Sequence, residues 1–431
     1  MAHIVFVDSR PYGFRAVTTA RRMGHEITFI ASEAFGASYT GNAAFDALAE
    51  EVDRVVRVEN SCDPQELRKT LDRLVAEHPV DAVIALHDEV VQSLAPVARD
   101  MGLRYTSAEG VANARDKAHA RELLAAAGLP GLAYEVIDSA HDIPGAVDRV
   151  GLPAVVKPAS GSASVAATVV RTASDVELAR RRVLDADAWL SAAQKQAFGS
   201  RLVVERYLEG PLLSVEIAVS DGVAVPFAVL ERQRYAADES MELGSIAPAR
   251  LTPDEDAAVR AYATDVVNAL GLDFGIFHIE VIHTAQGPCL IDPNPRLIGG
   301  PAPLLIKECW GVDLHEQLVH VFLGHPVEQP PRAPRREGAA HILAPTADVT
   351  YAGDADLAFL DEDPRVRHWA LRAEAGQRIR RATSNFHYIG HVLAVADTYL
   401  EAADVCISSV SELADRTGIP MIVWSPLSDD R

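Results

Sequence analysis

Residues 289–300 read CLIDPNPRLIGG and place an acid, an amide and a guanidinium at every second position after a short apolar run. The three are Asp292, Asn294 and Arg296. Because alternate side chains of a strand lie on one face, these groups are expected to point the same way. Carboxylate and amide oxygens suit Mg²⁺, and a guanidinium can bind two phosphate oxygens. The stretch therefore predicts a metal and phosphate site at a strand end, with a solvated, proline-rich hairpin tip as the alternative.

A partner strand for this stretch is predicted just upstream, in FGIFHIEVIH. If the hairpin turn centres on Gln286, Glu280 lies directly opposite Asp292. His278 and Asn294 then share their face. The other face is expected to pack on the core and carries Phe277, Ile279, Val281 and Ile291. Since two apposed carboxylates repel each other without a cation, the pattern predicts Glu280, Asp292 and Asn294 as metal ligands.

Two lysines could contact the phosphates of a nucleotide. Lys157 lies within the apolar strand PAVVKPA, where an unpaired ammonium would be costly. The small residues that follow, Ser160, Gly161 and Ser162, would let backbone N–H groups approach phosphate oxygens. Lys117 begins a predicted helix in ARDKAHA and by itself is typical of a surface lysine. The chain has no GxxxxGK[ST] and no GxGxxG, which disfavours P-loop and dinucleotide-binding folds.

Other predicted strands also end in polar residues. LVVERYLEG offers Glu205 and then a backbone segment that could bond an adenine edge, although Glu205 with Arg206 is by itself typical of a surface pair. DAVIAL ends in His87, Asp88 and Glu89. Ligands of open α/β sheets bind at the carboxyl ends of strands. A solvated helix start is nevertheless the preferred interpretation of these three residues.

Composition restricts the class of protein. The chain has 431 residues, 48% of them hydrophobic and 23% charged, which indicates a globular protein of several domains. The net charge of −21 argues against a nucleic-acid partner, because phosphate contacts need a basic face. Its four cysteines are scattered, and no apolar run approaches a membrane span. We therefore expect a cytoplasmic protein that acts on small molecules, with no membrane or nucleic-acid partner.

The order of predicted elements indicates an α/β class for the first part of the chain and α+β for the rest. Strands and helices alternate through residues 1–112, which predicts a parallel sheet. Strands grouped in hairpins with flanking helices follow in 113–325. A linker rich in proline and arginine then leads into a third unit, 326–431.

Together these segments resemble the ATP-grasp superfamily. The resemblance covers about residues 1–400 and rests on the order of six segments: ARDKAHARELLAAAGLP, LPAVVKPASGSAS, VVERYLEG, SVEI, FHIEV and IDPNPRLIGG. It implies an ATP-grasp domain at 113–325, with a lid at about 133–203. It also implies a preceding Rossmann-like α/β domain and a biotin-carboxylase-like C-terminal domain that includes YIGHVLAVADTYLEAADV.

The resemblance also implies roles for individual residues. ATP would be bound by Lys117, Lys157, Ser160, Gly161 and Ser162, by the adenine hinge Glu205, Arg206, Tyr207 and Leu208, and by Glu216 near the ribose. Mg²⁺ or Mn²⁺ would be bound by Glu280, Asp292 and Asn294. Arg296 would stabilise an acyl-phosphate transition state, and Lys157 would assist.

Within the superfamily the chain looks most like bacterial L-amino-acid ligases and related carboxylate–amine ligases. MELGSIAPARL resembles their substrate loop, with Glu242 expected to hold a substrate ammonium and Ser245 at the place of a family histidine. Asp292 likewise replaces the usual metal-binding glutamate. The implied activity joins a carboxylate to an amine through an acyl-phosphate, with release of ADP and phosphate. The resemblance implies that the carboxylate belongs to an amino acid.

Two other functions stay open at this point. One is a biotin-carboxylase-like enzyme that activates bicarbonate, and the other is an ATP-binding regulatory module without turnover. The amine could also belong to a specialised metabolite or a peptide. Further candidate substrate contacts are His87, Arg232, Arg234 and Lys307, for which plain packing or surface roles are the alternative. The sequence does not determine the oligomeric state, although family members are often homodimers.

Overall fold

The protein is described from a computed structural model in which residues 1–161, 163–190, 195 and 198–424 are described. The N-terminal sheet is parallel, in the order β3-β2-β1-β4. Its strands are β1 (His3–Val7), β2 (Glu26–Ser32), β3 (Arg54–Val58) and β4 (Ala82–Ala85). Its helices are α1 (Phe14–Arg22), η1 (Glu33–Ser38), α2 (Ala43–Glu51), α3 (Pro64–Glu77) and α4 (Asp88–Asp100). The continuous apolar runs of β1 and β4 suit a parallel sheet that is covered on both faces.

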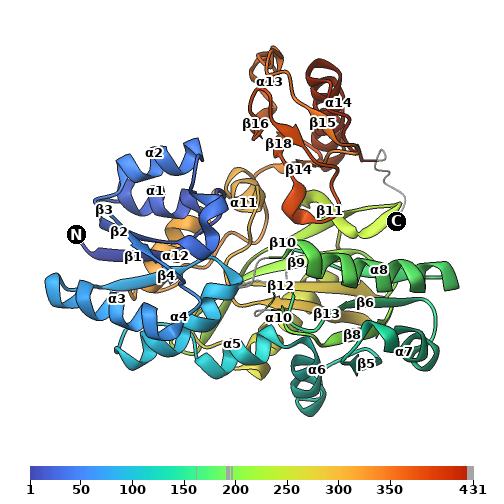
Figure 1. The fold of residues 1–431 in the computed structure, drawn as a ribbon, viewed down its shortest axis with the longest axis horizontal. Coiled ribbons are helices and arrows are strands. Elements are labelled where there is room, and N and C mark those ends of the chain that lie inside the picture. Colours follow the sequence, from blue (N-terminus) through green and yellow to red (C-terminus); the bar gives the residue numbers. More distant parts are fainter. Residues whose placement is uncertain (162, 191–194, 196–197, 425–431) are drawn as a thin grey trace.

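A second, antiparallel sheet has the order β5-β8-β6-β7 and lies in the region predicted as the lid. Its strands are β5 (Tyr134–Ile137), β6 (Ala154–Pro158), β7 (Thr168–Val170) and β8 (Leu202–Arg206). The helices before and around it are α5 (Ala108–Arg115), α6 (Lys117–Ala126), η2 (Ala140–Asp142), α7 (Ile143–Val150) and α8 (Ala173–Trp189). Figure 1 shows α7 and α8 beside this sheet.

An eight-stranded antiparallel sheet, in the order β13-β12-β9-β10-β11-β14-β18-β16, forms the centre of the molecule. Its strands are β9 (Leu212–Ser220), β10 (Val223–Tyr235), β11 (Asp238–Ala247), β12 (Gly275–Thr284), β13 (Gly287–Asn294), β14 (Glu337–Leu343), β16 (Val366–Leu371) and β18 (Gly390–Ala396). Helix α10 (Pro253–Leu270) packs on it through an apolar stripe. Because β14 pairs with β11, the sheet continues across the domain boundary that we predict near 325. The three-domain division stays a prediction.

The C-terminal region adds α14 (Tyr399–Thr417) against β14 and β18, the short helices α13 (Phe359–Glu362) and η3 (Asn385–His387), and the pair β15 (Val349–Thr350) and β17 (Arg378–Ile379). Helix α11 (Ala302–Trp310) packs on β11, β14 and β18 of the central sheet, whereas α12 (Leu314–Phe322) packs on α1 of the N-terminal unit. Their apolar side chains join the N-terminal core. None of the described helices is long and apolar enough to cross a membrane.

The β12–β13 hairpin has the predicted pairing but not the predicted turn. Thr284 pairs with Gly287, so the turn is one residue tighter than expected. A β-bulge at Ile291 then shifts the register, which brings Glu280 opposite Asp292. The pairing of the two carboxylates is therefore confirmed. Our expectation that Ile291 faces the core is wrong, because the bulge turns it into the pocket described below.

Candidate active site

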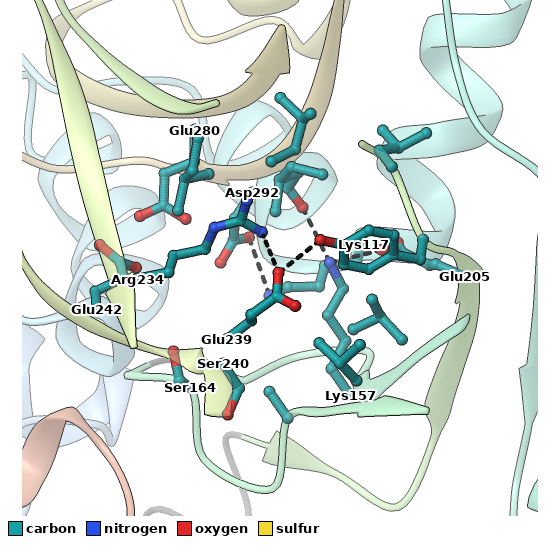
Figure 2. A pocket seen from close by; sticks show the side chains of 18 of the residues that line it. Lys117, Lys157, Ser164, Glu205, Arg234, Glu239, Ser240, Glu242, Glu280 and Asp292 are labelled. Carbon is teal, nitrogen blue, oxygen red and sulfur yellow. Dashed lines mark hydrogen bonds and ion pairs between the residues drawn. The ribbon is translucent and has the colours of Figure 1, made fainter. Parts of the chain in front are cut away.

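A pocket opens between the lid sheet and the central sheet, and Figure 2 shows its side chains. The lid side contributes β6, β8 and the loop after β6, whereas the floor is formed by β11 and the β12–β13 hairpin. Most of the candidate ATP and metal ligands meet here. Those that line the pocket are Lys117, Lys157, Gly161, Glu205, Arg206, Tyr207, Leu208, Glu280 and Asp292, whereas Asn294 does not line it. The candidate substrate contact Glu242 lines it as well.

Lys157 is buried and paired with a carboxylate, which offsets the free-energy cost of burying an ammonium group in an apolar strand. Its Nζ lies 2.7 Å from Glu205 Oε2 and donates to the Ile291 carbonyl at 3.2 Å. Arg121 binds the other oxygen of Glu205 at 2.9 Å. Burial by itself would raise the pKa of Glu205, but Arg121 and Lys157 hold it below its usual value. The surface-pair alternative for Glu205 is therefore wrong.

Arg121 was not predicted from the sequence. It lies one helical turn after Lys117 on α6, so the i,i+4 spacing of two cations was the available signal. Lys117 is also buried, which contradicts the surface interpretation. Its Nζ lies 3.0 Å from Asp292 Oδ1 and donates to the Gly161 carbonyl at 3.1 Å. Lys117 thus connects the lid loop to a candidate metal ligand.

The loop after β6 has unusual backbone geometry. Ala163, Ser164 and Ala166 all have φ near +57°, a left-handed conformation that costs energy for residues other than glycine. Gly161 and Ser164 line the pocket, whereas Ser160 is not among the lining residues. Ser162 lies outside the described residues.

The predicted hinge follows β8 directly. The N–H groups of Arg206 and Tyr207 donate to the carbonyls of Ala133 and Pro153, so a base edge would have to use the N–H of Leu208. Tyr207 Oη donates to Glu239 Oε2 at 2.5 Å. Figure 2 shows that Glu239 also contacts Arg234, whose NH1 group lies 3.2 Å from the same oxygen.

Glu239 is a pocket residue that sequence reasoning missed, because no local pattern distinguishes it from an exposed acid in a strand turn. The Arg171 guanidinium lies 4.5 Å from the centre of the Tyr207 ring. These contacts join the lid to the central sheet beside the hinge.

Glu216 does not lie where we expected it. It is fully buried and absent from the pocket lining, so a ribose contact is not supported. Its Oε1 instead lies 2.7 Å from Nδ1 of His278, whose Nε2 is 2.8 Å from Glu280. Burial alone would lower the pKa of His278, but the two carboxylates raise it to about 9. Glu216 therefore lies behind the candidate metal ligands rather than beside the sugar.

The candidate metal ligands fit a hard divalent cation. Glu280 and Asp292 face each other across the hairpin, and Asn294 is buried two residues further on. Within the residues that the structure describes, no three His, Cys, Asp or Glu side chains converge closely enough to hold a metal. A site would therefore need the Asn294 amide oxygen as well, which is a donor set suited to Mg²⁺. Lys117 and His278 compensate the two carboxylates in this structure.

Arg296 does not line the pocket, and it pairs with a residue from another region of the chain. Its NH2 group lies 2.9 Å from Asp88 Oδ2, and its NH1 group donates to the Leu297 carbonyl at 3.0 Å. Asp88 and Glu89 form the buried first turn of α4. Our interpretation of the HDE segment as a solvated helix start is therefore wrong.

The substrate-loop residues form a hydrogen-bonded relay. Arg232 Nε donates to Glu242 Oε2 at 2.7 Å, and Arg232 NH1 donates to Ser245 Oγ at 2.7 Å. Glu242 lines the pocket. Ser245 is buried and does not line it, so the structure does not support Ser245 as a direct substrate contact.

Three sequence profiles of known families match separate parts of the chain. The ATP-grasp domain matches residues 150–303, the ATP-grasp N-terminal domain matches 17–103, and the L-amino acid ligase C-terminal domain 2 matches 356–416. The chain therefore contains an ATP-grasp domain. The predicted fold class is confirmed, as is the superfamily.

Individual relatives of this ATP-grasp protein are distant. It is 26% identical over 433 residues to the uncharacterized protein y4rH of Sinorhizobium fredii, covering 96% of this chain and 85% of the relative. It is 24% identical over 261 residues to the alanine–anticapsin ligase of Bacillus amyloliquefaciens, and the match covers 56% of this chain and 54% of the ligase. The chain thus spans about half the length of that ligase.

Among solved structures, the L-amino acid ligase of Bacillus licheniformis superposes with a TM-score of 0.77. The superposition covers 99% of both chains at 20% identity. At this identity the likeness supports the fold of the ATP-grasp protein, and the substrates have to be argued from its own site.

Proposed function

We propose that this chain is an ATP-dependent, ADP-forming ligase that joins a carboxylate to an amine through an acyl-phosphate. The observation that carries the proposal is the convergence of Lys117, Lys157 and the Glu280–Asp292 pair in one pocket that ends at a hinge strand. The ATP-grasp fold and the relatives named above agree with this reaction class.

Each residue of the pocket would have a distinct task. Lys157 and Lys117 bind phosphate oxygens, and each must give up part of its present carboxylate contact to do so. Bound Mg²⁺, or Mn²⁺ in its place, would neutralise charge that develops on the phosphates. Arg296 stabilises the transferring phosphoryl group while the substrate carboxylate attacks it. The lid excludes water from the acyl-phosphate until the amine attacks.

An amino acid is the proposed carboxylate substrate. Arg232 contacts Glu242 through Oε2 alone, which leaves the second carboxylate oxygen to accept a hydrogen bond from a substrate ammonium. Ser245 acts through Arg232, since its hydroxyl fixes the guanidinium that orients Glu242. A cytoplasmic homodimer and the three-domain division belong to the same proposal.

Mg-dependent phosphate release tests the proposal. The purified protein is supplied with ATP and a matrix of carboxylates and amines that includes the amino acids, and mass spectrometry follows each positive reaction. Release that requires one pair, with a product lighter by one water than their sum, is the expected result. Release with bicarbonate and no amine would favour a biotin-carboxylase-like reaction instead. Bound ATP with no release anywhere would contradict the ligase and favour a regulatory module.

A further inference from the structure

Asp88 connects the N-terminal unit to Arg296, the candidate phosphoryl-binding arginine. It is the first residue of α4, which starts three residues after β4 ends. Its Oδ2 lies 2.9 Å from the NH2 group of Arg296, although 208 residues separate the two in sequence. The side chains of Asp88 and Arg296 are 5% and 17% exposed. The candidate phosphoryl-binding arginine is therefore paired inside the protein with a carboxylate from another part of the chain.

The remaining oxygen of Asp88 is out of reach of a substrate. Oδ1 is buried without a hydrogen-bond partner, and the NH1 group of Arg115 lies 3.8 Å away. Burial alone would raise the pKa of Asp88, but Arg296 and Arg115 hold it well below its usual value, so the carboxylate stays charged. Enclosed between two guanidinium groups, Asp88 can act on the reaction only through an arginine.

We propose that Asp88 is a positioning residue that fixes the guanidinium of Arg296 toward the transferring phosphoryl group. The Asp88 carboxylate binds the NH2 group of Arg296, and the Leu297 carbonyl accepts a hydrogen bond from its NH1 group. These two contacts fix the orientation of the guanidinium plane. A long arginine side chain that is fixed before the reaction loses little freedom when charge develops. This inference rests on the proposed function, because Arg296 needs a phosphoryl group to act on.

A plain structural role is the rival to be excluded, since an ion pair between two regions can simply dock them together. The chain offers a matched control. Arg99 of α4 pairs with Asp273 at 3.3 Å, joining the N-terminal unit to the loop before β12. Both control side chains are about half exposed, and their other hydrogen-bond partners are Tyr105, Thr106 and Ser107, none of which is a candidate site residue. A docking role predicts related effects for both pairs, whereas a positioning role predicts a catalytic effect for Asp88 alone.

The first experiment compares Asp88→Asn with Asp273→Asn in steady-state turnover. We expect Asp88→Asn to lower kcat about 10-fold or more with the KM for ATP changed less than about 2-fold, because Arg296 acts mainly on the transition state. Asp273→Asn should leave both constants within about 2-fold. Unchanged kcat in Asp88→Asn overturns the positioning role, as does a rise in KM for ATP alone. No turnover by the unaltered protein would overturn the proposed function, a different result.

A second measurement separates positioning from general damage. Asp88→Asn is added to Arg296→Met, and kcat and the thermal midpoint are measured for all four proteins. If Asp88 acts through Arg296, the added change costs no further kcat, and the two shifts in midpoint fall short of additive. Independent, multiplying losses of kcat together with additive shifts in midpoint would overturn the inference.

Discussion

The two parts of the candidate site, the pocket with its lysines and the Arg296–Asp88 pair outside the pocket lining, are built differently. At the nucleotide end, Lys157 and Lys117 pair with Glu205 and Asp292, and all four residues lie within residues 113–325. At the reacting end, Arg296 pairs with Asp88 from the N-terminal unit. The nucleotide end can therefore form within one region. The reacting end needs two regions to be docked correctly.

This difference has a consequence for binding. Both lysines at the nucleotide end already have carboxylate partners, so ATP must exchange one set of charge contacts for another. Metal and nucleotide are expected to bind there with positive cooperativity, because a cation bound to Asp292 frees Lys117 to contact a phosphate. Changes at the nucleotide end should affect binding, whereas changes at the reacting end should affect mainly the rate.

The largest expected effect is that of Lys157→Ala. It removes a phosphate-binding ammonium and leaves Glu205 paired only with Arg121, so phosphate release should fall by about 100-fold or more. The fold should survive, which circular dichroism would check. Lys69→Ala, at an exposed site on α3, is the matched control and should keep full activity. Turnover close to normal in Lys157→Ala would refute its role.

Arg296→Ala should come next and act on the rate. Loss of its donors to the transition state should cost about 3 kcal/mol, which is more than about 100-fold in kcat. ATP binding measured by calorimetry should change little, in contrast to Lys157→Ala. If Arg296→Ala instead weakens ATP binding and leaves kcat intact, the contrast between the two ends is wrong.

Glu280→Gln should weaken the metal site. One charged oxygen donor is lost opposite Asp292, so the Mg²⁺ concentration that half-saturates ATP binding should rise about 10-fold. Calorimetric titration of ATP at several Mg²⁺ concentrations measures this without turnover. Glu255→Gln, at the exposed start of α10, keeps its helix cap and should leave the Mg²⁺ dependence unchanged. An unaltered Mg²⁺ dependence in Glu280→Gln would remove Glu280 from the ligand set.

The smallest effect is expected from Ser245→Ala. It removes one acceptor from Arg232, and the net contribution of one hydrogen bond is about 1 kcal/mol. The KM of the substrate that contacts Glu242 should rise by about 5- to 10-fold, with the KM for ATP unchanged. A change confined to the KM for ATP would show that the relay does not serve the substrate.

Local patterns predicted much of the nucleotide end. The alternation of FHIEV and LIDPNP predicted two facing strands with Glu280 and Asp292 on them, and the lysine in PAVVKPA indicated a site rather than a plain core strand. The turn position was wrong, and only the bulge at Ile291 restored the register. A bulge has no reliable signature in a single sequence, because it depends on how the strand meets its neighbours.

Residues that act through distant partners could not be predicted in this way. Glu239, Arg121 and Asp88 look like ordinary surface charges in their local sequence. The family resemblance implied that Glu216 lies near the ribose, yet its side chain contacts His278. The identity of a charged residue gives its chemistry, but only packing decides which group it meets.

The sequence by itself determined the class of fold, the two facing strands that carry the acids and the lysines that suit phosphates. These follow from periodicity and from the cost of burying charge, which act over a few residues. Tertiary structure alone decided that Glu205 would bind Arg121, 84 residues away, and that Arg296 would bind Asp88, 208 residues away. Ion pairs of this kind leave no local pattern, because their geometry exists only after separate elements have packed together.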